Sequence, residues 1–508
     1  MSHVYPEPGV RRFITASVMA ATVMNALDTT IANVALPHIQ GSVAASADEI
    51  SWVLTSYIVA AAIGTPLAGW LAGRFGRKRL MALSIVGFTL ASGLCGLSQT
   101  LGEIVGFRLL QGVFGAALIP MSQAILLDIN PPEKHGSAMA IWSMGAVMGP
   151  IVGPTLGGWL TDNMTWRWVF YINLPIGVLA LLGVWVFLSD ARDTDQKGLD
   201  LFGFSTLALA IGSLQLMLDR GQTQDWFSST EICLEAGSAA FFFYLFVAHS
   251  LTARRPFVDA ALFADRNFVS GSVLALVMGV VLYGVLALLP PMLEGLLGYP
   301  VIFTGIVTAP RGIGSFVAMS IAGMLMRKVD PRFIVLTGLL LMSASMYRMA
   351  GFSLGMDYRP LVVTGFIQGL GTGFVFVPLS VVTFGTLDPK YRNEGAAMFA
   401  LIRNIGSAGG ISILQALSTR NGAIVHSRLI EAVRPDNPVM AWAAPGFDFT
   451  SPHAVAVLNA QVTAQAAMVA YTDDFWLLFL LGIVAVPLVF LIRKARPRPA
   501  GEAQLHMD

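Results

Sequence analysis

Long apolar segments separated by short polar loops are the dominant pattern in this chain of 508 residues. A membrane-spanning helix needs about 20 apolar residues. Segments of that length lie near 13–36, 51–72, 80–99, 103–127, 136–160, 166–188, 201–218, 232–250, 268–290, 302–326, 333–352, 360–384, 395–417 and 475–492. The pattern therefore predicts an all-α membrane protein with fourteen transmembrane helices, whose functional site lies inside a helix bundle.

The distribution of lysine and arginine predicts the topology of these helices. If the N-terminus is cytoplasmic, the inner loops and tails hold 21 of the 31 basic residues. Cytoplasmic loops carry such an excess in membrane proteins. We therefore expect a multi-pass protein of the cell inner membrane with both termini in the cytoplasm.

The composition excludes several other classes of protein. The charged fraction is 12%, against roughly 25% in soluble domains. A net charge of +1 gives no reason to expect a nucleic-acid partner. The sequence contains no HExxH, Walker A or Cys/His metal-binding pattern. We expect no cofactor, no metal and no enzymatic activity, and energy from an ion gradient.

Short internal repeats divide the chain into two halves. AGWLAGRFGRKR from Ala68 is echoed by AGMLMRKVDPR from Ala322, and GSAM from Gly136 by GAAM from Gly395. Such repeats are typical of transporters built from two related halves. The expected organisation is an N-terminal tail at 1–12, a six-helix half at 13–188, a linker with two extra helices at 189–266, a second six-helix half at 267–492 that includes a long outer loop at 418–472, and a C-terminal tail at 493–508. The extra pair has no repeat partner, so we interpret it as an insertion outside the core machinery.

Asp28 is the one acidic residue that the pattern places deep inside a span, about 12 Å from its outer end at 1.5 Å per residue. A charged carboxylate there costs several kcal/mol, so we expect it to be neutral during part of a transport cycle. Arg108 enters its span at a similar depth, about 8 Å, so the two side chains are expected to interact. The alternatives are that Asp28 anchors Asn25 or Asn33 structurally, and that Arg108 extends to the outer interface.

Two further arginines, two asparagines and one glutamine are candidate substrate contacts. Arg311 and Arg403 lie about 14 Å and 12 Å from their span ends, where reaching the interface is harder. Either can contact substrate or tether helices. Asn25, Asn33 and Gln111 complete the candidate substrate-binding set. Because three arginines outnumber one buried acid, we expect neutral or weakly acidic substrates and poor binding of large dications.

Several motifs together resemble the major facilitator superfamily. They are LDTTIANVALP from Leu27, GWLAGRFGRKR from Gly69, RLLQGVFGAALIP from Arg108, GPIVGPTLGG from Gly149, and LDRG followed by WFSS in the linker. The set is similar to the fourteen-span drug:proton antiporter branch, and within it to the EmrB type of multidrug exporter. This resemblance implies the major facilitator fold, proton coupling through Asp28 and Arg108, and a partnership with a periplasmic adaptor protein and an outer-membrane channel.

The resemblance also assigns two gating motifs. The antiporter motif comprises Gly149, Pro150, Gly153, Pro154, Gly157 and Gly158, and the cytoplasmic basic loop comprises Gly69, Arg74, Gly76, Arg77 and Lys78. Small residues at a spacing of four let helices approach closely, and prolines bend them. We expect the antiporter motif to form a sealed, flexible contact between the halves. The alternatives are ordinary helix packing for the glycines and a simple topology signal for the basic loop.

These expectations converge on a proton-coupled secondary antiporter that exports lipophilic drugs. A metabolite or nutrient transporter on the same fold is the alternative, and a membrane-embedded enzyme or sensor is less favoured because no reactive cluster or soluble domain is found. The loop at 418–472 is expected to carry a helix within 455–470 and to dock the adaptor. A disordered or lid-like loop is the alternative.

Overall fold

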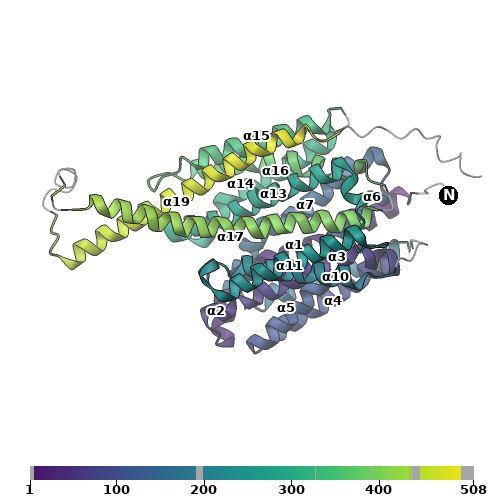
Figure 1. Ribbon diagram of the computed structural model, residues 1–508, viewed down its shortest axis with the longest axis horizontal. Coiled ribbons are helices and arrows are strands. Elements are labelled where there is room, and N and C mark those ends of the chain that lie inside the picture. Colours follow the sequence, from purple (N-terminus) through teal and green to yellow (C-terminus); the bar gives the residue numbers. More distant parts are fainter. Residues whose placement is uncertain are drawn as a thin grey trace, which may run out of the picture.

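The computed structural model describes residues 5–189, 198–326, 328–388, 391–434, 436–437 and 447–493. The predicted tails and the linker therefore lie partly outside the described residues, at 1–4, 494–508 and 190–197. Every regular element in the described ranges is helical, which confirms the all-α prediction. Figure 1 shows long helices running side by side in an elongated bundle.

The first half and the linker follow one another along the chain. The first half contains α1 (Pro8–Val43), α2 (Ala47–Ile50), α3 (Trp52–Phe75), α4 (Arg77–Leu97), α5 (Leu101–Gly115), α6 (Leu118–Ile129), η1 (Pro132–Lys134), α7 (His135–Asn163), α8 (Trp168–Tyr171) and α9 (Asn173–Phe187). The linker contributes α10 (Leu201–Arg220), η2 (Trp226–Ser228), α11 (Thr230–Thr252) and α12 (Ala261–Ala264).

The second half begins at α13 and ends at α19. Its elements are α13 (Arg266–Pro291), the π-helical turn η3 (Met292–Leu296), α14 (Val301–Leu325), α15 (Pro331–Met349), α16 (Arg359–Gly385), α17 (Arg392–Ala432) and α19 (Pro452–Val489). In the described residues, 13 helical stretches are long and apolar enough to cross a membrane. The helix α15 is not among them, so the count of fourteen stays a prediction.

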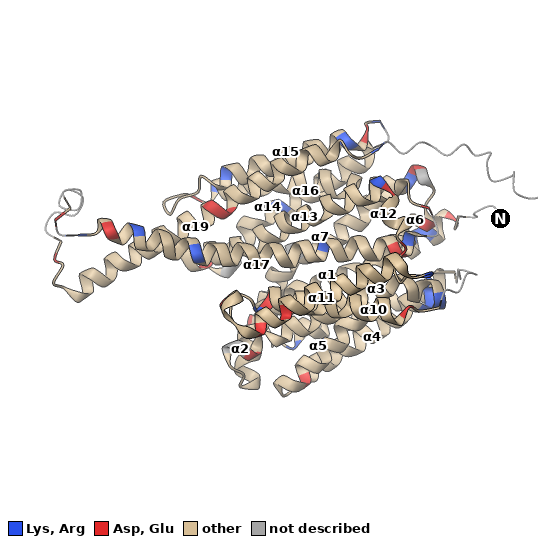
Figure 2. Ribbon diagram, viewed as in Figure 1, with Lys and Arg blue, Asp and Glu red and all other residues tan. Residues whose placement is uncertain are grey.

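Lipid is the solvent for the outer surface of this bundle. Large apolar side chains such as Leu179 and Trp185 are 69% and 61% exposed. Charged residues lie mainly near the helix ends, with few along the middle of the bundle (Figure 2). Contact between water and an apolar surface of this size is unfavourable, so the surface is stable only against the hydrocarbon of a bilayer.

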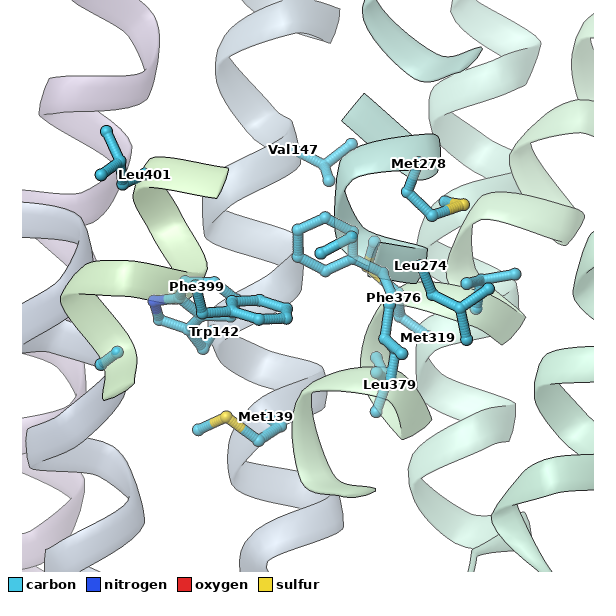
Figure 3. Close-up of a cluster of buried hydrophobic side chains, with 14 of the residues drawn as sticks. Met139, Trp142, Val147, Leu274, Met278, Met319, Phe376, Leu379, Phe399 and Leu401 are labelled. Atoms are coloured by element: carbon cyan, nitrogen blue, oxygen red, sulfur yellow. The ribbon is translucent and has the colours of Figure 1, made fainter. Parts of the chain in front are cut away.

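A buried apolar cluster joins the two halves. Trp142 of α7 stacks on Phe376 of α16 with 5.8 Å between ring centroids, and the indole N–H donates to Ser122 Oγ over 2.9 Å. Figure 3 shows Met139 and Val147 of α7 together with side chains from the second half, including Leu274, Met278, Met319, Leu379 and Phe399. This packing excludes water between the halves at that level.

The two longest helices extend far beyond the others, at the end of the bundle opposite the N-terminus (Figure 1). The helix α17 has 41 residues and α19 has 38, so both continue beyond the predicted spans, which end at 417 and begin at 475. The predicted helix within 455–470 is part of α19. His426 and Asn459 pair across the two extensions at 3.2 Å. We call these extensions, Ser418–Ala432 and Pro452–Thr472, the helical arm.

Candidate functional site

A cavity of about 970 Å³ lies between the halves. Its lining comes from α1, α3, α5, α6 and α7 on one side, from α13, η3, α16 and α17 on the other, and from α10 of the linker. The volume falls at the upper end of the range for small-molecule sites, about 300–1,000 Å³. The lining reaches His38 on α1, Asp162 on α7 and Glu294 on η3 at the predicted outer ends of these helices, and it stops at Phe376 of the apolar cluster. The cavity therefore faces the predicted outer side.

Asp28 and Arg108 form a buried ion pair within the first half. Nη1 of Arg108 donates to Oδ2 of Asp28 over 2.6 Å. The Asp28 side chain is fully buried and that of Arg108 is 1% exposed. The predicted interaction is therefore present, and the alternative in which Arg108 reaches the outer interface does not describe this conformation.

Two amides complete the shell around the Asp28 carboxylate. Nε2 of Gln111 and Nδ2 of Asn173 each donate to Oδ1 over 2.9 Å. Nδ2 of Asn173 also donates to Ser92 Oγ over 3.0 Å. All three neighbours of Asp28 are donors, an arrangement that matches an ionised, acceptor-only carboxylate. We call Asp28, Arg108, Gln111 and Asn173 the polar network.

Tyr57, an aromatic neighbour of Arg108, connects this network to the cavity. Neither Asp28 nor Arg108 lines the cavity, whereas Tyr57 and Asn25 do. The guanidinium lies 4.2 Å from the centroid of the Tyr57 ring, and Nδ2 of Asn25 donates to the Tyr57 hydroxyl over 3.1 Å. A ligand that moves Tyr57 therefore acts on the ion pair through direct contact.

The remaining predicted contacts divide between the cavity and the helix interiors. Asn33 and Arg403 line the cavity, and the Arg403 guanidinium lies 5.7 Å from the Phe376 ring centroid. Gln111 belongs to the polar network and does not line the cavity. Arg311 is 5% exposed and is not part of the lining either. Its Nε and Nη2 are buried without hydrogen-bond partners.

Two further acidic residues lie beside the ends of predicted spans, one of them buried and the other facing the cavity. Asp474 of α19 is 1% exposed. Asp219 of α10 lines the cavity and accepts a hydrogen bond from Thr55 of α3. The charge count behind the prediction of neutral or weakly acidic substrates is wrong, because Arg108 is paired, Arg311 lies elsewhere, and Asp162, Asp219 and Glu294 line the cavity. Among the described residues, no group of three or more His, Cys, Asp or Glu is placed to hold a metal ion.

The antiporter motif packs on α1 within the same half. A Cβ on Gly149 would lie 1.9 Å from the carbonyl oxygen of Ala26, and one on Gly153 would lie 2.1 Å from Thr30 Oγ1. Gly157 likewise faces Ile31, whereas Gly158 and Pro154 line the cavity. The side chain of Pro150 lies outside the described residues. The expected contact between halves is therefore wrong for Gly149, Gly153 and Gly157, and these glycines instead bring α7 against α1.

The basic loop lies where the halves meet at the other end of the bundle. A Cβ on Gly69 would lie 3.0 Å from Glu394 Cα of α17. Gly76 has a φ of 86°, which favours glycine and turns the chain from α3 into α4. Arg74 and Lys78 lie over the rings of Trp70 and Trp185 in the same half.

Asp128 links the two halves near this loop. Its carboxylate pairs with Arg77 of α4 and, over 3.1 Å, with Nη1 of Arg392 at the start of α17. Arg77 and Asp128 belong to the first half and Arg392 to the second. Together with the close approach at Gly69, this ion pair closes the cavity at its predicted cytoplasmic end.

Comparisons with known proteins agree with the motifs. A family model described as Major Facilitator Superfamily matches residues 18–411. The chain is 36% identical over 481 residues to the Multidrug export protein EmrB of Escherichia coli (strain K12), covering 93% of this chain and 94% of that protein. It is 34% identical over 485 residues to the Fatty acid resistance protein FarB of Neisseria gonorrhoeae, covering 95% and 96%.

Solved structures show the same architecture at low sequence identity. The proton:xylose symporter XylE bound to 6-bromo-6-deoxy-D-glucose has a TM-score of 0.62 and 13% identity, with 95% of each chain covered. The human organic anion transporter MFSD10 has a TM-score of 0.59 and 15% identity, covering 94% of this chain and 100% of that one. At these identities the likeness shows a shared fold alone.

Proposed function

This chain belongs to the major facilitator superfamily, and we propose on that basis that it exports lipophilic drugs in exchange for protons. The names of the relatives, multidrug export and fatty acid resistance, support apolar or amphipathic substrates. The cavity between the halves supports alternating access, in which the halves rock to expose one site to each side in turn. The observation that carries the proposal is the polar network buried directly behind the cavity wall.

Proton coupling follows from the chemistry of that network. Protonation of Asp28 removes the negative charge that balances Arg108, and an unbalanced buried guanidinium is costly. The network therefore has to rearrange when the proton arrives, and Tyr57 passes that rearrangement to the cavity wall. Substrate binding acts in the reverse direction, since it displaces Tyr57 and favours the ionised pair. Each proton that moves inward supplies about 2.3 kcal/mol per 100 mV of membrane potential.

We place the protein in the cell inner membrane with both termini cytoplasmic. In that orientation the cavity opens to the periplasm, the Asp128–Arg392 pair closes the cytoplasmic side, and the helical arm projects outward. The arm exposes Val455 and Val457, at 42% and 47%. An arm of paired helices is a suitable docking element for a periplasmic adaptor protein and, through it, an outer-membrane channel.

The docking role is separable from transport. Removing the arm and the residues between its two helices should abolish drug resistance in cells while leaving drug uptake into inverted proteoliposomes intact. Equal loss in both settings would show that the arm serves folding or gating instead.

A drug-susceptibility panel tests direction and substrate together. The gene is expressed in a pump-deficient Gram-negative host, beside Asp28→Asn at matched membrane abundance. We expect raised resistance to lipophilic drugs with the wild-type chain and none with the variant. Unchanged susceptibility to every drug, combined with growth on a metabolite that the host cannot otherwise take up, would favour the nutrient-transporter alternative.

A further inference from the structure

The outer end of α10 is bound to both halves of the transporter. Ser412 of α17 donates its hydroxyl to the backbone carbonyl of Leu218, and Thr55 of α3 donates its hydroxyl to the carboxylate of the next residue, Asp219. Two neighbouring residues of the linker helix therefore accept hydrogen bonds from opposite halves. This position is inconsistent with an insertion that stands apart from the core machinery.

The same end of α10 contributes polar groups to the cavity. Gln215 and Asp219 both line it. They are four positions apart in the sequence, so they lie on the same face of α10, one turn apart. Ser412 lies in the lining as well. The helix α10 is therefore a wall of the cavity, and Asp219 is exposed there.

The charges in the lining are arranged by depth. The carboxylates of Asp162, Asp219 and Glu294 line the cavity, and the guanidinium of Arg403 is the fixed positive charge among the described lining residues. Arg403 and Ser412 lie on the same helix, so at 1.5 Å per residue they are separated by roughly 13 Å along its axis. Because Leu218 contacts Ser412, Asp219 lies near the level of Ser412 and far from Arg403.

These distances determine whether a bound cation interacts more strongly with Asp219 or with Arg403. A cation in contact with Asp219, at about 4 Å, is roughly three times closer to that carboxylate than to Arg403, and Coulomb energy falls with distance. Attraction by Asp219 therefore exceeds repulsion by Arg403 in the outer part of the cavity. The cavity wall is largely apolar and includes Leu54 and Ile58 of α3, the helix that carries Thr55. Such a wall suits a lipophilic ligand.

We propose that Asp219 is a specificity-determining residue that binds the positive group of lipophilic monocations, and that α10 is part of the substrate site. The inference rests on the proposed export function and adds a substrate class to it. Thr55 is a positioning residue, because its hydroxyl holds the carboxylate at the cavity wall.

Binding in detergent tests this assignment without transport. The probes are tetraphenylphosphonium and the neutral triphenylphosphine oxide, measured by equilibrium dialysis on the purified full chain. Asp219→Asn keeps the size and removes the charge, so we expect affinity for the cation to fall about tenfold or more while affinity for the neutral probe stays within twofold. Asp219→Glu should restore part of the cation affinity.

A matched control separates a local contact from general surface charge. Asp225 is an exposed acid in the loop that follows α10 and does not line the cavity. Asp225→Asn should leave the affinity for both probes unchanged. Equal loss of both probes in Asp219→Asn, or equal loss of the cation in both variants, would overturn the assignment. If the wild-type chain binds neither probe, the proposed drug-binding function fails first, and the inference fails with it.

Discussion

Replacing Arg392 with glutamine should open the cytoplasmic side of the cavity. The Arg392 side chain is 23% exposed and Asp128 is 19% exposed, so their pair is intermediate between surface pairs, worth about 0–1 kcal/mol, and buried charged hydrogen bonds, worth about 1.5–3 kcal/mol. A loss of about 1.4 kcal/mol corresponds to a tenfold change in an equilibrium constant. Because this pair joins the halves only when they meet at that end, its loss shifts the population toward the inward-open state by about tenfold.

Double electron–electron resonance measures that shift directly. Spin labels at Phe75→Cys and Phe333→Cys report on the ends of α3 and α15 in opposite halves, where both side chains are exposed, and Cys233→Ser removes the exposed native thiol. Arg392→Gln should increase the long-distance population. Lys78→Gln is the control, since Lys78 contacts Trp185 within one half. Identical distance distributions in Arg392→Gln and the control would refute the closing role of the pair.

Two further predictions concern the antiporter motif and the inner part of the cavity. Gly149→Ala should lower the free energy of unfolding of the purified protein by about 1–3 kcal/mol, because its Cβ would lie 1.9 Å from the Ala26 carbonyl oxygen. Gly158→Ala is the control and should have little effect, because its Cβ would lie 3.8 Å from Val34. Equal melting temperatures of the two variants would contradict the close packing at Gly149. Arg403→Ala should weaken binding of weakly acidic drugs more than that of neutral analogues in an equilibrium binding assay, and a uniform loss would indicate a packing role.

Hydropathy predicted the helices because the bilayer imposes a minimum length on every span. Each of the fourteen predicted segments is helical in the structure. The same rule fails beyond the membrane. After 417 the chain becomes polar and includes Thr419, Asn421 and Gly422, which are weak helix formers. The helix α17 nevertheless continues to Ala432, and its extension pairs with that of α19 through His426 and Asn459. The long helix α19 likewise begins well before the predicted span at 475, which hid the buried position of Asp474.

The sequence predicted the depth of a residue along its helix better than the direction in which its side chain points. The similar depths of Asp28 and Arg108 predicted an interaction that the structure contains. Arg311 and Arg403 also have similar depths, yet Arg311 is enclosed beside α16 while Arg403 faces the cavity. Rotation about the helix axis depends on packing between distant segments, which one sequence does not reveal.

Asn173 and Asp219 were missed for related reasons. Asn173 is a polar residue within a predicted span, but no motif or spacing in the sequence relates it to Asp28, to which it donates a hydrogen bond. Asp219 was overlooked because the linker helices were interpreted as an insertion. Its contact with Thr55 depends on α10 packing beside α3, which the order of elements alone does not predict.

Proton release upon drug binding tests the central claim that Asp28 couples protons to drug export. Purified wild-type protein and Asp28→Asn are mixed with drug in weakly buffered detergent solution across about pH 5 to 9. We expect the wild-type chain to release protons, and Asp28→Asn to bind the drug without releasing any. Proton release by Asp28→Asn, together with drug transport against a gradient in proteoliposomes, would contradict the account and place the coupling group elsewhere.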